Sequence, residues 1–444
     1  MEQKVISKKI KDMAYSTAIK LSDYDKIIEC SKEEQNYMEI DGQTFHIYSD
    51  LSLSHGLPAL CILYGELNEL YPEEGWDIKG HEYMKKLGEL LEENSNILLS
   101  MLAGLSGIGL AAVCLSKGGT RYKDFISYIN EFIKINLKEL LGFLKSKSSV
   151  SIEDYDAISG ISGILNYCML FKYDMNEEIT MMLNYIVDLC KDIEFNGIKV
   201  PGWYIKSENQ FTEQEKKTWK NGCFNVGLSH GVPSLLVNLC NAEKLNIKVS
   251  GQRESIEKIA KFLFDYSALE EKGLGWDYVV SFEDYKNNIK THECCRDAWC
   301  YGTPGVSYSL FIAGDALKNQ EYMNYAVETM KIAGKRAKHT YSPTFCHGYS
   351  GIAYISNKFY ELTNIDEFKC IALNLCKKII SFYDEENVFN FQDIDEKQGE
   401  LHYYNSVGIL EGVSGIILTL LAIKEGRKTP WDTAFSLGDY KQRF

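Results

Sequence analysis

The stretch Gly104-Leu-Ser-Gly-Ile-Gly-Leu-Ala-Ala-Val-Cys-Leu115 joins a short glycine motif to an apolar run. Glycine permits a tight entry with close backbone approach, and serine suits a capping position or the first turn of a helix. The residues that follow are apolar on nearly every side, and a helix of that kind must be buried all round. The stretch therefore predicts a buried helix that begins at its glycine motif.

The same motif, Gly-x-[Pro/Ser]-[Gly/Ala/Ser], occurs seven times in the 444 residues, always ahead of apolar residues. The steps between successive copies are 48, 56, 71, 71, 46 and 64 residues. A step of 46 residues has room for two helices and two loops, so the longer steps imply insertions. The copies begin at Gly56, Gly104, Gly160, Gly231, Gly302, Gly348 and Gly412.

Amphipathic segments lie between the motifs. In Tyr122–Lys145, apolar residues recur at spacings of three and four, with Lys and Glu on the opposite face. Seven pairs of a buried and an amphipathic helix can stack as an open solenoid or close into a ring. A solenoid needs polar terminal repeats, whereas the first and last motifs here are as apolar as the others. The predicted fold class is therefore all-α, an α/α toroid (barrel) of seven inner and seven outer helices, in a single domain over residues 1–444.

The two 71-residue steps contain different material. Phe195–Ile205 and Leu274–Phe282 are rich in β-branched and aromatic residues near glycine, which is typical of short strands. We expect the insertions near residues 190–225 and 270–292 to form a small β-containing accessory lobe.

Composition excludes several function classes. The 48 basic and 62 acidic residues give a net charge of −14, and the lysines alternate with acidic residues, which argues against a nucleic-acid-binding surface. We find no apolar run of the roughly 20 residues that a membrane span needs, and no signal peptide. The 13 cysteines show no disulfide framework, so reduced cytoplasmic thiols are expected. Six of them lie in apolar helical runs and are predicted to be core residues: Cys61, Cys114, Cys168, Cys240, Cys370 and Cys376.

Polar residues collect at one position of the repeat, directly before the first glycine. Three of the eight histidines occupy this position. In a closed ring equivalent positions share one level, so these side chains are expected to rim one mouth of the barrel. In order they are His55, Ala103, Ser159, His230, Tyr301, His347 and Glu411.

Cys300, Cys346 and His347 are a candidate zinc site. Thiolate and imidazole are good Zn²⁺ ligands, and three protein ligands leave an open fourth position, as in catalytic sites. The spacing alone leaves open that the cysteines are simply small buried residues. His55 and Glu411 are expected to be structural or to line the mouth. Cys294 and Cys295 lie off the repeat position and are expected to be structural or at the surface.

Trp299-Cys-Tyr-Gly302, Phe345-Cys-His-Gly348 and Leu228-Ser-His-Gly231, set on seven glycine motifs, resemble the lanthipeptide (lantibiotic) cyclase family. The resemblance extends from about Ser52 to Lys424. It implies an α/α barrel, with a small inserted lobe in some members. It also implies zinc-dependent thioether formation: cysteine thiols of a precursor peptide add to dehydroalanine or dehydrobutyrine and give lanthionine or methyllanthionine rings.

The resemblance also implies roles for single residues. One Zn²⁺ per chain would be held by Cys300, Cys346 and His347. Acid–base work falls on His230. The remaining catalytic positions fall on Asp156, Arg296 and Tyr301, with Asp154 as the alternative to Asp156.

These residue types suit the chemistry. A thiol with a pKa near 8.5 is mostly protonated at pH 7, and zinc favours the thiolate nucleophile. Attack on Cβ gives an enolate that needs a proton at Cα, which a histidine titrating near neutrality can supply. Arg296 could stabilise the enolate, and Asp156 could orient a partner.

The implied partners are a dehydrated precursor peptide with its leader and, in a biosynthetic complex, a dehydratase and a transporter at the inner face of the cell membrane. Three alternatives stay open. One is a relative that adds glutathione or another free thiol to dehydroamino acids. Another is a non-catalytic, peptide-binding scaffold. The last is a carbohydrate-active toroid, which would rely on paired carboxylates rather than Cys and His.

Overall fold

The computed structural model of the protein describes residues 2–94, 96–270, 273–290, 296–397 and 399–440. The chain divides into two compact units. Since each unit is described by itself, a single domain over residues 1–444 stays a prediction. Unit 1 comprises Met1–Leu98, Leu102–Ser127 and His339–Trp431, and unit 2 comprises Leu99–Met101, Tyr128–Lys338 and Asp432–Phe444.

The first glycine of every motif is the N-cap residue of a helix. Proline lies within the first two helical positions of three of these helices, where its missing N–H costs nothing. The predicted helix starts are thus confirmed. The seven motif helices are α3 (Leu57–Leu70), α5 (Leu105–Leu115), α7 (Ile161–Met169), α10 (Val232–Lys244), α13 (Thr303–Leu317), α15 (Tyr349–Thr363) and α17 (Val413–Glu425).

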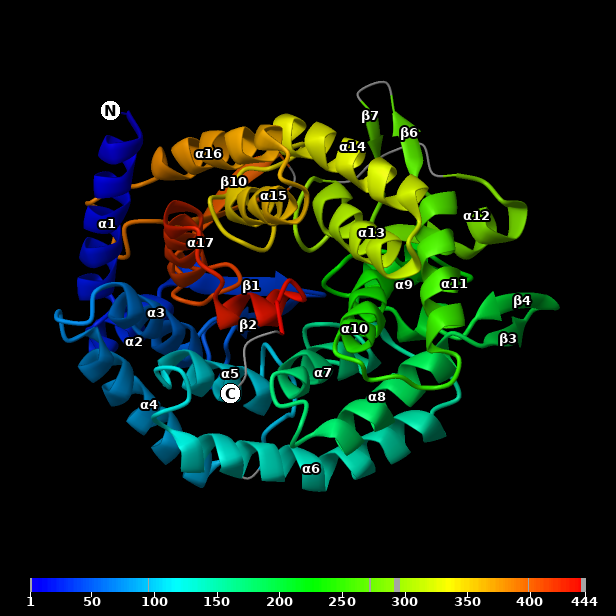
Figure 1. The fold of residues 1–444 in the computed structure, drawn as a ribbon, viewed down its shortest axis with the longest axis horizontal. Coiled ribbons are helices and arrows are strands. Elements are labelled where there is room, and N and C mark those ends of the chain that lie inside the picture. Colours follow the sequence, from blue (N-terminus) through cyan, green and yellow to red (C-terminus); the bar gives the residue numbers. More distant parts are fainter. Residues whose placement is uncertain (1, 95, 271–272, 291–295, 398, 441–444) are drawn as a thin grey trace. The chain divides into compact units, whose positions relative to one another are not determined.

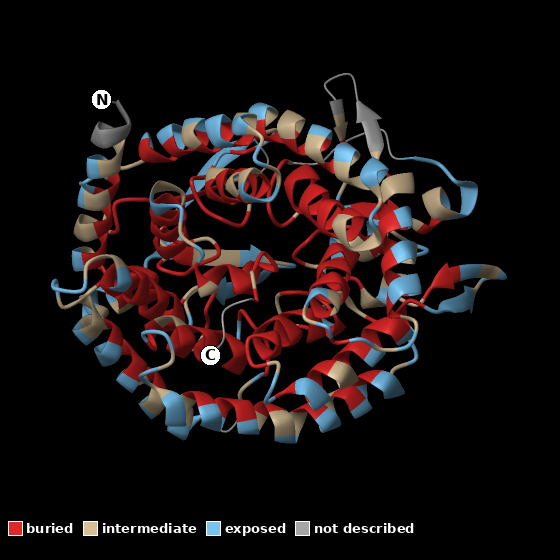
Figure 2. Cartoon of the chain, in the orientation of Figure 1, coloured by how far each residue is buried: buried red, intermediate tan, exposed pale blue. Residues whose placement is uncertain are grey.

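The motif helices are buried on nearly all sides, whereas a second set of long helices has one exposed face (Figure 2). In α17, for example, every residue from Val413 to Ala422 is buried. The apolar runs and the amphipathic segments of the sequence therefore correspond to these two sets. The second set is α1 (Glu2–Lys20), α4 (Trp76–Glu93), α6 (Lys123–Ser146), α8 (Asn176–Leu189), α11 (Gln252–Asp265), α14 (Gln320–Arg336) and α16 (Asp366–Ile380).

Within unit 1, the N-terminal helix α1 packs against the last motif helix, α17 (Figure 1). Helix α17 contacts α1, α3 and α15, so the N-terminal helix supplies the amphipathic partner of the last motif helix. This contact is what closure of the repeat requires. The unit also contains α2 (Tyr24–Ser31) and two antiparallel hairpins that the sequence did not predict: β1 (Tyr37–Ile40) with β2 (Gln43–His46), and β9 (Asp393–Lys397) with β10 (Glu400–Tyr404).

The loops before α3 and α17 meet backbone to backbone. Ile409 N–H donates to Leu53 O at 3.2 Å. Gly408 lies so close to this seam that a Cβ there would be 1.7 Å from Ser54 O. A side chain at residue 408 would therefore have to push the two loops apart.

We expect Gly408→Ala to lower the free energy of unfolding by about 1–3 kcal/mol, because overpacking against backbone forces the loops to shift. The matched control is Gly88→Ala in α4, where a Cβ would meet nothing within 4 Å. That control should stabilise by up to about 1 kcal/mol through helix propensity. Urea unfolding of both variants tests whether the close contact between the two loops limits stability. Equal unfolding midpoints for the two variants would contradict this expectation.

Unit 2 contains the two long insertions. Helix α10 contacts α7, α11 and α13, and α13 contacts α14. The stretches Phe195–Ile205 and Leu274–Phe282, which are expected to form strands, contain β4 (Ile198–Pro201) and β8 (Val279–Ser281) and overlap β7 (Gly273–Gly275), whereas the partner strands begin outside them. The pairs are β4 with β3 (Asp192–Phe195), β8 with β5 (Cys223–Asn225), and β7 with β6 (Ala268–Glu270). The short helices α9 (Glu213–Thr218) and α12 (Phe282–Asn287) lie in the same insertions.

The cysteines within the described residues are free thiols. Of those predicted to be core residues, Cys370 is exposed and that prediction is wrong. Cys370 lies on the solvent-facing side of α16, in line with exposed Asp366 and Asn374, where the apolar run is interrupted. Cys294 and Cys295 lie outside the described residues.

Candidate active site

The polar residues of the repeat all precede a helix start. In unit 1, His55, His347 and Glu411 lie before α3, α15 and α17, and in unit 2 His230 and Tyr301 lie before α10 and α13. A glycine at the start of a helix lets the preceding loop pack closely against neighbouring backbone, which restricts the conformation of the loop. The side chains on that loop are therefore held in position too. Each unit therefore presents its own set of polar groups at helix N-termini.

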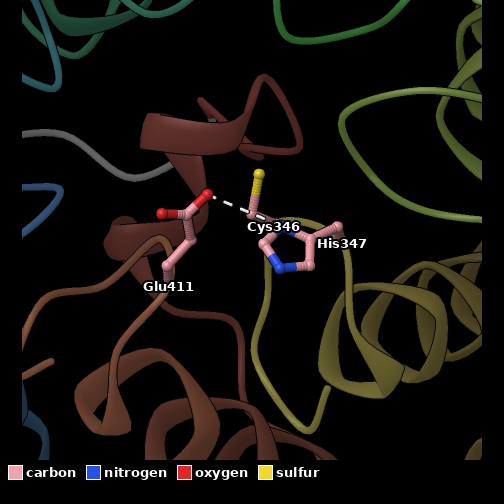
Figure 3. Close-up of side chains that lie close together, drawn as sticks. All are labelled: Cys346, His347 and Glu411. Atoms are coloured by element: carbon pink, nitrogen blue, oxygen red, sulfur yellow. Dashed lines mark ion pairs between the residues drawn. The ribbon is translucent and has the colours of Figure 1, made fainter. Parts of the chain in front are cut away.

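In unit 1, Cys346, His347 and Glu411 form a cluster (Figure 3). One potential ligand atom from each lies within 4.8 Å of the others. Glu411 reaches toward His347 from the neighbouring loop, with Oε1 3.5 Å from Nδ1. The two loops are joined by a hydrogen bond from Cys346 N–H to Leu410 O at 2.9 Å.

The donor atoms of this cluster fit zinc. Thiolate sulfur, imidazole nitrogen and carboxylate oxygen are the ligand types that Zn²⁺ accepts. The side chains of Cys346 and His347 are largely buried, which shields the cluster from bulk water. The sequence predicted Cys346 and His347 as metal ligands. For Glu411 it predicted only a structural role or a place in the lining of the barrel mouth.

A buried carboxylate outside every motif also contacts this cluster. Asp393 Oδ1 lies 3.3 Å from His347 Nε2 and accepts hydrogen bonds from Ser342 Oγ at 2.7 Å and Thr344 Oγ1 at 2.9 Å. Burial alone would raise the pKa of Asp393, but His347 and the two hydroxyls together hold it below its usual value. No sequence motif points to Asp393, because it lies in the long step before the seventh motif.

His55 lies beside the same cluster. Its Nε2 is 4.0 Å from Glu411 Oε2, and burial lowers its pKa. His55, His347, Asp393 and Glu411 line a cavity of about 30 Å³. His55 thus lines the site within unit 1, which is one of the roles expected of it.

In unit 2, Asp156 and His230 are in direct contact. His230 Nδ1 donates to Asp156 Oδ2 at 2.6 Å. The other carboxylate oxygen of the fully buried Asp156 accepts backbone N–H groups of Ile158, Ser159 and Gly160 at 3.1, 2.7 and 2.8 Å. The carboxylate therefore holds the loop that leads into α7 and fixes the imidazole at the same time.

Asp154, the alternative to Asp156, has a different partner. Lys147 Nζ donates to Asp154 Oδ1 at 2.6 Å, and Ser151 N–H donates to Oδ2 at 2.9 Å. Asp154 thus stabilises its own loop, and Asp156 is the aspartate at His230.

Tyr301 lies next to His230, with ring centroids 6.0 Å apart. Its hydroxyl oxygen accepts Asn225 Nδ2–H at 3.2 Å, so its own O–H is left to donate. Burial raises the pKa of Tyr301, so the phenol keeps its proton at neutral pH. Gly227 makes room for this ring, since a Cβ there would lie 2.4 Å from it.

The environment of His230 shifts its titration. Burial lowers its pKa, but the hydrogen bond and the charge of Asp156 outweigh burial, and the net pKa is raised. A raised pKa stabilises the folded state below about pH 6.5, and this contribution is lost as pH rises through the folded pKa.

We therefore expect Asp156→Asn to lower the pKa of His230 and to destabilise the protein more near pH 6 than near pH 9, as checked by imidazole NMR titration and urea unfolding at both pH values. Asparagine keeps an oxygen for the backbone N–H groups, so the difference between the two pH values isolates the charge. An unchanged His230 titration would contradict the pairing.

The remaining predicted residues are in unit 2. Cys300 is buried, and its carbonyl oxygen accepts Ser229 N–H and Oγ–H, both at 3.2 Å. Arg296 is half-buried and follows directly on residues outside the described part of the chain. Cys346 and His347 belong to unit 1, so the three-ligand set with Cys300, like the role of Arg296, stays a prediction.

The chain is similar to known proteins over most of its length. The lanthionine synthetase C-like protein family matches residues 48–436. Nisin biosynthesis protein NisC of Lactococcus lactis subsp. lactis is 31% identical over 380 residues, which are 84% of this chain and 85% of that protein.

Among solved structures, nisin cyclase is similar with a TM-score of 0.76 and 28% identity, over 88% of this chain and 93% of that one. This likeness confirms the predicted fold class, an all-α α/α toroid with short β insertions. None of the helices in the described ranges is long and apolar enough to span a membrane. Because the family model, the sequence identity and the fold all agree, the chain belongs to the lanthionine synthetase C-like protein family.

Proposed function

We propose that this protein closes thioether rings in a precursor peptide by adding cysteine thiols to dehydroalanine or dehydrobutyrine, as a zinc-dependent cyclase. The similar proteins are named for nisin biosynthesis and nisin cyclisation, and the family match covers most of the chain. The observation that carries the proposal is the Asp156–His230 pair, because an imidazole that is held in orientation and still partly exposed is what the proton transfer in this reaction needs.

Cys346 and His347, with Cys300 as the predicted third ligand, would hold one Zn²⁺ per chain, and Glu411 is the carboxylate beside them. When bound, the ion would supply the Lewis acidity that favours the thiolate form of a peptide cysteine at neutral pH. Since the cluster is largely buried, these residues would also exclude water from the reacting sulfur.

The reaction is a conjugate addition. The substrate thiol loses its proton, and its sulfur attacks Cβ of the dehydroamino acid. A C–S bond forms while the Cα=Cβ π bond breaks, and the electron pair spreads over Cα and the carbonyl oxygen. A proton then returns to Cα, so the mass of the peptide does not change.

His230 is suited to deliver this last proton. Because Nδ1 donates to Asp156, Nε2 is the nitrogen left to face a substrate, and the raised pKa increases the protonated fraction of His230 relative to a free imidazole. The Tyr301 O–H can donate to the oxygen on which negative charge develops. Arg296 would add a positive charge toward the same oxygen.

The proposed substrate is a dehydrated precursor peptide that still bears its leader. A dehydratase and a transporter are the proposed partners of a complex in the cytoplasm, at the inner face of the membrane. These partners fit the chemistry, since one must supply dehydroamino acids and the other must remove a finished peptide.

The test is to incubate zinc-loaded enzyme with a dehydrated, cysteine-containing precursor, with and without glutathione, and then to record peptide mass and alkylatable thiols. Ring closure predicts fewer alkylatable thiols at constant mass, even when glutathione is present. A peptide that gains the mass of glutathione would indicate the free-thiol reaction instead. No change with several precursors would favour a peptide-binding scaffold.

A further inference from the structure

Asp393 is a buried carboxylate that the reaction above does not use. It begins strand β9 in unit 1, and its side chain is 6% exposed. A carboxylate in such a place is costly unless its oxygens are satisfied. Neighbouring hydroxyl groups and His347 satisfy one of its oxygens.

Two hydroxyl groups hold Asp393 in place. Ser342 Oγ accepts the backbone N–H of Thr344 and of Ile394, both at 3.2 Å, so its single O–H is free to donate to Asp393 Oδ1 at 2.7 Å. Thr344 Oγ1 donates to the same oxygen at 2.9 Å. An oxygen that receives two buried O–H donors is best explained as a carboxylate in its charged form.

The imidazole of His347 lies between two carboxylates. Nε2 is 3.3 Å from Asp393 Oδ1, and Nδ1 is 3.5 Å from Glu411 Oε1. Figure 3 shows the side of the ring that faces Glu411, where Cys346 also lies. The two nitrogens therefore have different surroundings. Nε2 faces Asp393, which two hydroxyl groups hold in place, and Nδ1 faces the side of the ring where Cys346 and Glu411 lie.

We propose that Asp393 is a positioning residue that holds the proton of His347 on Nε2, so that Nδ1 is the nitrogen offered to a metal ion. In neutral imidazole one nitrogen carries the proton and the other has the lone pair. A charged carboxylate favours a proton on the nitrogen that it faces. Asp393 is nearer to the ring than Glu411, 3.3 against 3.5 Å, and two hydroxyls hold it in place, so it has the stronger claim on the proton. This inference rests on the metal-dependent function proposed above.

The opposite tautomer would set the lone pair of Nε2 against the Asp393 carboxylate, and it would leave Nδ1 without the lone pair that a metal ion needs. A carboxylate behind a ligating histidine fixes tautomer and ring orientation, and its removal typically weakens metal binding 10- to 100-fold.

The test compares Asp393→Asn with Asp395→Asn. Asp395 is on the same strand and lines the same cavity, so the control removes an equal charge nearby. Asparagine at residue 393 can still accept from the two hydroxyls, but its amide also offers N–H donors to His347 Nε2. The measurements are Zn²⁺ affinity by chelator competition and the His347 tautomer by ¹⁵N NMR of the metal-free protein.

We expect wild type and Asp395→Asn to show the Nε2–H tautomer and equal affinity. Asp393→Asn should bind zinc about 10- to 100-fold more weakly and gain the Nδ1–H tautomer. Unchanged affinity and tautomer in Asp393→Asn would overturn the inference while leaving the cyclase proposal intact. If wild type bound no zinc, the proposed function itself would fail.

The wild-type spectrum decides the matter even if Asp393→Asn does not fold, which thermal unfolding of the metal-free variant would reveal. An Nδ1–H tautomer of His347 in wild type contradicts the proposal outright. An Nε2–H tautomer supports it, and Thr344→Ala, which removes one of the two hydroxyl donors, should then weaken zinc binding by a smaller factor.

Discussion

Replacing His230 with asparagine is expected to slow ring closure about 100- to 10,000-fold while the zinc content stays at that of wild type. Asparagine can keep a hydrogen bond to Asp156 but cannot deliver a proton to Cα. Rates are measured as loss of alkylatable thiols from a dehydrated precursor, and zinc is measured by elemental analysis of the purified variant.

The matched control is His402→Asn, an exposed histidine on β10, which should keep both the rate and the metal. A His230→Asn variant with full rate would refute the acid–base role. Loss of zinc in that variant would instead assign His230 to the metal site.

Replacing Cys346 with alanine is expected to reduce bound zinc from one per chain to near zero and to abolish ring closure. Cys346 Sγ belongs to the only group of potential metal ligands found among the described residues. Removing a thiolate from a site with few protein ligands removes much of its affinity. The readouts are zinc per chain and the thiol count of the peptide.

Cys370→Ala is the control for this variant, because Cys370 is an exposed cysteine of the same unit. It should retain one zinc and the wild-type rate. If Cys346→Ala also retained stoichiometric zinc, the metal would have to be bound elsewhere.

The helices could be predicted from the sequence because their signal is local and repeated. Each glycine motif forms an N-cap, and each apolar run forms a buried helix, as in Gly104–Leu115. The hairpins β1–β2 and β9–β10 escaped prediction because their strands are short, only four or five residues each. Exposed residues such as Phe45 and Leu401 also blur the alternation in these strands.

Only those residues of the candidate site that occupy the repeated position before a motif glycine could be predicted from the sequence. The position before each first glycine correctly grouped His347, Glu411 and His55 within unit 1. Asp393 was missed because it comes from an insertion, and only folding brings it to His347. The choice between Asp154 and Asp156 needed geometry too, because both lie just before one motif.

We propose that this chain forms thioether rings with the help of a bound metal. The most direct test follows the number of alkylatable cysteines in one dehydrated precursor, incubated with enzyme that is zinc-loaded, zinc-stripped or stripped and then reloaded. We expect loss of thiols at constant peptide mass with loaded enzyme, no loss after stripping, and recovery of thiol loss on reloading. Thiol loss that is unaffected by stripping, or absent with fully loaded enzyme, would contradict it.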